Sequence, residues 1–315
     1  MPGFAVLDEV SCKHSDHGDH TLEHYWGELA ALAGALSWAI ATLIFSKFAH
    51  HLSAMQMTLT KGCLALTLML GTLLFMPLPS AHVTLEPMLW LALSGFIGIA
   101  IGDSAYFAAL RRIGPNRTLL LESLAPPLSG ILALCLLGDH LGWQSWLGVV
   151  VTTAGVTWVV MKPDPEKGYN RAGLAYGLLA SCCQATGVVI SHYALVTSQL
   201  PALWGATLRL GCGTLAVALW LAVSQPTALR QLSGLIYRQP GRRYLFLGNL
   251  VGTYLALWLQ QSALKLANPA VAQTLLATSP LFLLPLALWQ GEPLSKRLVL
   301  GTGMALFGIL LFFWR

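Results

Sequence analysis

Charged side chains stand inside apolar stretches at three positions of the first half of this sequence. Lys61, Asp103 and Glu122 each lie about five to seven residues from one end of such a stretch, which is roughly 7–11 Å in an α-helix. A charge at that depth in lipid costs about 2.5–3.5 kcal/mol. Because all three depths are measured from the same side, we expect one polar layer. It could relay protons or bind a zwitterion, and a structural ion pair is the alternative.

The carboxylate of Glu122 stands beside a predicted bend. Pro126 lacks an amide hydrogen, so the carbonyl of Glu122 loses its helical partner, and Pro127 does the same to Ser123. Open backbone within a membrane span is tolerated only where protein or a cavity covers it. Thr118, Glu122 and Pro126 are spaced by four and share one helix face. The spacing therefore predicts a bent helix whose carboxylate faces a cavity.

Amide side chains replace the acids in the second half. Arg209 lies about seven residues into its apolar stretch, Gln260 lies near the end of the next, and Gln273 begins a stretch that Pro280 breaks. We expect these residues to form a similar layer near the opposite membrane face. Gln184, in an earlier stretch, is a further candidate for binding. Hydrogen bonding between helices is the alternative role for such amides in lipid.

Two aromatic residues lie in the middle of apolar stretches of the first half. Trp38 is central in the first stretch, and Tyr106 is one helical turn from Asp103. Aromatic side chains at such positions either line a cavity or fill the core between helices. We therefore treat Trp38 and Tyr106 as candidate lining residues.

A polar tail precedes the first apolar stretch. Its histidines are spaced three, three and four residues apart, with acidic residues between them: His14, His17, His20 and His24. Imidazole with carboxylate suits Zn or Ni, but the spacing matches no closed zinc site. The tail is either a solvated segment or a weak metal binder, and no other cofactor is expected.

The composition excludes a soluble protein. Hydrophobic residues make up 56% of the chain and charged residues 10%, whereas soluble domains carry about 25% charge. Each membrane span needs about 20 apolar residues. We predict an all-α polytopic membrane protein with about ten transmembrane helices, near residues 27–47, 54–76, 88–110, 117–137, 143–161, 172–194, 202–224, 244–265, 269–290 and 298–314.

The two halves of the chain share landmarks at a nearly constant offset. Ala109-Leu110 recurs as Ala263-Leu264, 154 residues later, and Gly148 recurs as Gly301, 153 residues later. Five predicted helices per half give the second half the opposite orientation in the membrane. The predicted organisation is a tail (1–26), a first five-helix repeat (27–161), a linker (162–171) and a second, inverted repeat (172–315). In such proteins the site lies where broken helices of the two repeats meet.

The stretch GDSAYFAALRRIGPNRTLLLESLAPPLSGILALCLLGDHLGWQSWLGVVVTTAGV resembles the repeat of the EamA family in the drug/metabolite transporter superfamily. The shared features are an aromatic-x-x-Ala-Leu helix end, a mid-helix proline and a Gly-rich last helix. The first copy departs from the pattern with Asp139 in place of Glu. The resemblance implies ten helices around a central cavity, alternating access, and export of small organic metabolites.

The predicted topology follows from the distribution of basic residues. Thirteen of the 18 Lys and Arg lie in the odd-numbered connections between predicted helices. The positive-inside rule places those connections in the cytoplasm and both termini outside. The family resemblance implies the reverse. In either case we expect a multi-pass protein of the cell (inner) membrane.

We therefore expect a secondary active transporter and not an enzyme, and exchange of the solute for protons is one way to drive it. The first alternative is a transporter of divalent metal ions whose His-rich tail collects the metal. The second is a membrane-embedded enzyme that acts on lipid. The sequence has no G-x-x-x-x-G-K-[ST] loop and neither H-E-x-x-H nor G-x-S-x-G. The expected partners are the lipid bilayer and a small-molecule substrate, with no nucleic acid. Monomer and homodimer both fit the sequence.

Overall fold

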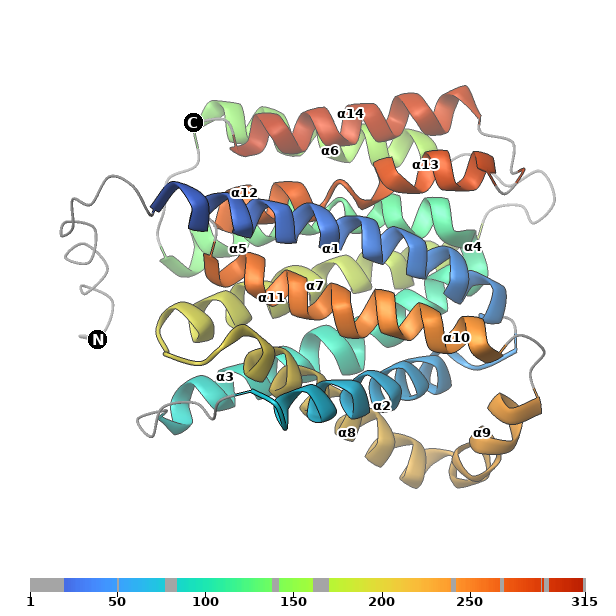
Figure 1. The fold of residues 1–315 in the computed structure, drawn as a ribbon. Helices are drawn as coiled ribbons and strands as arrows, with labels where there is room; N and C mark the ends of the chain where they lie inside the picture. The colour runs from blue at the N-terminus through green and yellow to red at the C-terminus, as the bar shows by residue number, and fades with distance from the viewer. Residues whose placement is uncertain are drawn as a thin grey trace.

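The computed structural model describes residues 20–49, 51–76, 84–137, 142–160, 170–238, 242–266, 269–289, 291 and 295–313. The regular elements in this part of the chain are all helical (Figure 1). The first half contains α1 (His20–Phe48), α2 (Ala54–Leu73), α3 (Leu85–Gly95), η1 (Phe96–Asp103), α4 (Ser104–Glu122), α5 (Ala125–Leu137) and α6 (Trp143–Val160). The second contains α7 (Arg171–Val196), α8 (Ala202–Ser224), α9 (Pro226–Arg238), α10 (Arg242–Asn249), η2 (Leu250–Leu255), α11 (Ala256–Leu266), α12 (Pro269–Leu276), α13 (Ser279–Trp289) and α14 (Lys296–Phe313).

Four helical stretches of the described chain are long and apolar enough to cross a membrane: Trp26–Phe48, Leu85–Glu122, Arg171–Val196 and Ala202–Ser224. The second of these has 38 residues and would be about 57 Å long as one straight helix, far longer than the hydrocarbon core. It bends at Gly114, where φ is 77°. The sequence separates two predicted helices in the same region, between residues 110 and 117.

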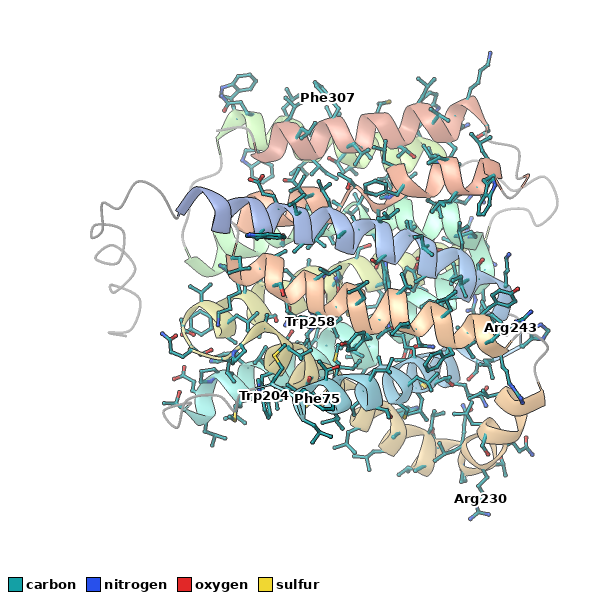
Figure 2. All side chains as sticks on the ribbon, viewed as in Figure 1. Phe75, Trp204, Arg230, Arg243, Trp258 and Phe307 are labelled. Atoms are coloured by element: carbon teal, nitrogen blue, oxygen red, sulfur yellow. The ribbon has the colours of Figure 1, made fainter. Side chains whose placement is uncertain are left out.

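The outside of the bundle is apolar. Phe75 is 91% exposed and Phe307 is 56% exposed, and Figure 2 shows Phe307 on the outer side of α14. Arg230 and Arg243 both lie toward the same end of the bundle in that view. An apolar flank with basic residues at one end suits a protein surrounded by lipid.

The first helix of each half packs against the other half. Helix α1 contacts α10, η2, α11, α12 and α13, while α7 contacts α3, η1, α4 and α5. The last helices, α6 and α14, lie side by side (Figure 1). A Cβ on Gly155 or Gly301 would overlap the facing helix, so these glycines permit the close approach of α6 and α14. The two halves are therefore interlocked rather than merely adjacent.

Irregular helical segments recur at the same offset in the two halves. The π-helical segments η1 and η2 begin at Phe96 and Leu250, 154 positions apart. A second pair of interruptions follows, because α4 ends at Glu122 and α12 ends at Leu276, again 154 positions apart. π-segments and helix breaks are frequent at functional sites.

The long connection after α8 contains the amphipathic helix α9. This helix spans Pro226–Arg238. Leu232 is buried, and Leu229 and Ile236 pack against the core beside it. Gln56 Nε2 donates to the carbonyl of Ala228 at 3.1 Å. The apolar face of α9 therefore contacts the bundle.

Candidate functional site

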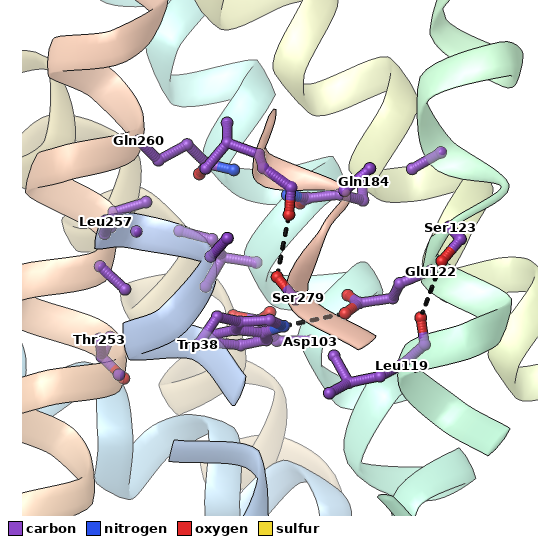
Figure 3. A pocket seen from close by; sticks show the side chains of 18 of the residues that line it. Trp38, Asp103, Leu119, Glu122, Ser123, Gln184, Thr253, Leu257, Gln260 and Ser279 are labelled. Carbon is purple, nitrogen blue, oxygen red and sulfur yellow. Dashed lines mark hydrogen bonds between the residues drawn. The ribbon is translucent and has the colours of Figure 1, made fainter. Parts of the chain in front are cut away.

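A cavity of ≈ 110 Å³ lies between the two halves, at the level of the helix interruptions. Its walls come from α1, α2, α7, α8 and α11 and from both π-segments and both helix breaks. Figure 3 shows the side chains that project into it. The polar lining residues are Trp38, Lys61, Asp103, Glu122, Ser123, Gln184, Arg209, Thr253, Gln260 and Ser279.

An ion pair occupies one wall of the cavity. Lys61 Nζ lies 2.6 Å from Asp103 Oδ2, and the two side chains are 4% and 17% exposed. The ammonium group also lies 5.1 Å from the ring centroid of Trp38 and 5.4 Å from that of Phe107. Both aromatic faces attract a cation. The Lys61 charge is thus neutralised by Asp103 and enclosed by aromatic rings.

Glu122 is held by a neutral donor. Trp38 Nε1 donates to Glu122 Oε2 at 2.9 Å (Figure 3). The indole is fixed in turn by Tyr106, whose ring centroid lies 5.3 Å away. The hydroxyl groups of Tyr106 and Thr42 are hydrogen-bonded at 2.7 Å. Among the described residues no cation lies within 4.0 Å of the Glu122 carboxylate, so its charge has no direct ion-pair partner there.

Arg209 enters the cavity from α8 and is buried, with 1% of its surface exposed. Its Nη1 donates to Gln260 Oε1 at 3.3 Å and its Nη2 to Gln184 Oε1 at 3.5 Å. Its Nε has no hydrogen-bond partner. In the described part of the chain no carboxylate lies within 4.0 Å of the guanidinium. Its direct polar contacts are therefore with neutral amides, and Asp103 acts on its charge only from beyond ion-pair distance.

The structure brings six of the eight predicted binding residues to this cavity: Trp38, Lys61, Asp103, Glu122, Gln184 and Arg209. Pro126 and Pro280 line it too, and Pro127 is buried beside Pro126. Tyr106 lies behind Trp38 instead. The side chain of Gln273 lies outside the described residues.

The predicted metal ligands cannot be placed. His14 and His17, and the side chains of His20 and His24, lie outside the part of the chain that the structure describes. Within the described residues no three or more His, Cys, Asp or Glu side chains are grouped so as to hold a metal ion.

We expected two polar layers near opposite membrane faces, and the residues predicted for them from both halves line a single cavity. Simple geometry allows both. Layers about 7–11 Å deep from opposite faces of a hydrocarbon core about 30 Å thick are only about 8–16 Å apart. The long side chains of Lys61 and Arg209 extend across part of that distance.

Sequence reasoning missed Ser123, Thr253 and Ser279 as lining residues. A usable signal exists, because lining positions recur 154 residues apart, as in Ile99 and Thr253. The other pairs are Asp103 and Leu257, Glu122 and Leu276, Ser123 and Ala277, Ala125 and Ser279, and Pro126 and Pro280. Each carboxylate of the first half therefore has a leucine at its equivalent position.

The chain is similar to known transporter sequences along most of its length. The chain is 26% identical over 289 residues to a protein of Archaeoglobus fulgidus described as an uncharacterized transporter, which covers 90% of this chain and 96% of that one. A solved structure described only as "Crystal structure of protein" has the same fold, with a TM-score of 0.63 and 16% identity over 91% of this chain and 97% of that one. The model of the EamA-like transporter family matches residues 25–161 and 171–314. The chain therefore belongs to the EamA-like transporter family and is a membrane transporter rather than an enzyme.

Proposed function

We propose that the protein is a secondary active transporter that exports small, amino-acid-like or drug-like organic solutes by alternating access, with protons as the coupling ion. In this proposal ten membrane-spanning segments form two inverted repeats of five in the cell (inner) membrane. The cavity between the halves is the solute site. Movement of one repeat against the other opens it to each side in turn.

The arrangement of the helices supports this mechanism. Both the π-segments and the helix breaks contribute to the cavity wall, and they recur 154 positions apart. Broken helices at a repeat interface are typical of transporter binding sites. Helices α1 and α7 each belong to one half and pack against the other half. A shift of one half against the other would therefore also move part of the cavity wall.

The hydrogen bond from Trp38 to Glu122 is the observation that carries proton coupling. Lys61 lies 2.6 Å from Asp103 and is committed to it, whereas Glu122 accepts its hydrogen bond from a neutral indole at 2.9 Å. Protonation of Asp103 would break a buried ion pair. Protonation of Glu122 would break none within the described residues. Glu122 is therefore the carboxylate best suited to exchange a proton during transport.

Transport by proteoliposomes with an imposed pH gradient tests the proposal. A panel of radiolabelled amino acids and small drug-like amines would first identify a solute whose movement the gradient accelerates. We expect Glu122→Gln to abolish that acceleration, because glutamine preserves volume but cannot ionise. Glu86→Gln is the matched control, since Glu86 is exposed at the start of α3. Gradient-driven transport by Glu122→Gln at the wild-type rate would exclude Glu122 as the coupling residue.

A further inference from the structure

Arg209 is the cation of the cavity that has no carboxylate within ion-pair distance among the described residues. The described charged side chains that line the cavity are Lys61, Asp103, Glu122 and Arg209. Lys61 and Asp103 neutralise each other at 2.6 Å. Among the described residues the Arg209 guanidinium donates hydrogen bonds to the amide oxygens of Gln184 and Gln260, at 3.5 and 3.3 Å, and the Asp103 carboxylate lies beyond ion-pair distance. A buried charge without a partner is costly, so the arrangement suits a state in which an anion is present.

The guanidinium is held in place by glycines of two helices. A Cβ on Gly98 of η1 would lie 2.8 Å from Arg209 Nη2, and one on Gly187 of α7 would lie 3.3 Å from it. On α3, a Cβ on Gly95 would overlap the carbonyl of Arg209 itself. The side chain therefore occupies a slot that only glycines leave open. A larger residue at Gly98 would have to displace the guanidinium.

The donors of Arg209 are largely unused. A guanidinium has five N–H groups in a planar fork that matches a carboxylate. Two of its nitrogens make long hydrogen bonds to amides, and Nε makes none. A carboxylate could replace the amide oxygens with shorter, charge-assisted bonds. Gln184 and Gln260 could then donate their own NH₂ groups to the same anion.

We propose that Arg209, with Gln184 and Gln260, binds the carboxylate group of the transported solute. This inference rests on the proposed function and narrows it to solutes that carry a carboxylate. Lys61 is not an equivalent anion site, because Asp103 already occupies it. The Glu122 carboxylate lines the same cavity, and so a second negative charge on the solute would be repelled. The site is thus suited to a single carboxylate rather than to a dianion.

The test compares acids with their amides on the wild-type protein. Thermal stability of the detergent-purified protein would be measured with leucine and leucinamide, phenylalanine and phenylalaninamide, and benzoate and benzamide. We expect at least one acid to stabilise the protein with an affinity about 10- to 100-fold above that of its amide. Equal binding of acid and amide, preference for the amides, or no binding of any acid overturns the assignment.

Variants separate binding from folding. Arg209→Gln should bind acid and amide equally, and Arg230→Gln, at an exposed arginine on α9, should keep the preference. Gly98→Ala should fold, because the close contact of its new methyl group is with the end of the flexible Arg209 side chain, and Gly187 Cα lies at an ordinary 3.7 Å. It should lose most of the preference by displacing the guanidinium. Gly71→Ala is its control, since nothing lies within 4 Å of a Cβ there. Retention of the preference by both Arg209→Gln and Gly98→Ala contradicts the proposal.

The two proposals fail in different ways. Transport of neutral or cationic solutes with no acid preference would retain the exporter and overturn the role of Arg209. Arg209-dependent binding of acids without any transport in liposomes would retain the anion site and overturn the proposed function.

Discussion

Removal of Lys61 should destabilise the protein strongly, because Asp103 would lose its partner. At 2.6 Å and an effective dielectric constant of about 20, the direct attraction is roughly 6 kcal/mol. Desolvation of both groups offsets part of it, and breaking a buried pair from one side costs about 3–5 kcal/mol. We expect Lys61→Met to lower the free energy of unfolding by about 3–5 kcal/mol. At roughly 2 °C per kcal/mol for a chain of this size, the midpoint of thermal unfolding should fall by about 6–10 °C.

A double-mutant cycle isolates the pair. Lys61→Met, Asp103→Asn and the double variant would be compared by intrinsic fluorescence during heating in detergent. Since neutral partners leave no buried charge, the double variant should be more stable than the sum of the single losses predicts. Lys47→Met is the control, because Lys47 is exposed near the end of α1. Simple additivity of the two single losses would refute the interpretation that these residues stabilise each other.

Three further expectations concern packing, topology and the tail. Gly301→Val should lower the midpoint of thermal unfolding, because a Cβ there would overlap Val159 of α6. Gly303→Val is the control and should leave the midpoint unchanged, since nothing lies within 4 Å of a Cβ there; equal midpoints for the two variants would contradict the α6–α14 contact. The distribution of basic residues predicts external termini, so a C-terminal fluorescent fusion should be dark, and bright cytoplasmic fluorescence would favour the opposite orientation. Deletion of residues 1–24 should remove weak Zn or Ni binding measured by calorimetry, and unchanged binding would exclude the tail as ligand.

Much of the fold follows from the sequence because membrane insertion makes apolar length a direct signal. The stretches near 172–194 and 202–224 correspond closely to α7 and α8. The interruption after Glu122 lies where Pro126 and Pro127 remove two amide hydrogens. The π-segments carry no such local cause in the sequence. Their positions are seen only in the structure, where the two segments begin 154 residues apart.

The contacts between helices could not be predicted from the sequence. That α1 packs against the second half and α7 against the first depends on contacts between segments far apart in sequence. The partner of Glu122 also depends on it, because Trp38 lies 84 residues away. Depth along a helix indicated that Lys61 lies near both acids. It could not indicate that Lys61 pairs with Asp103 while Trp38 donates a hydrogen bond to Glu122, since these contacts depend on the rotation of each helix about its axis.

Comparison of solute exchange with proton-driven transport tests the central claim most directly. Proteoliposomes containing wild type or Glu122→Gln would be assayed for counterflow of a transported solute without a gradient, and for accumulation of that solute under an imposed pH gradient. If Glu122 carries the proton while the rest of the cavity binds the solute, Glu122→Gln should retain counterflow and lose accumulation. Accumulation by Glu122→Gln at the wild-type level, with counterflow intact, would contradict the account.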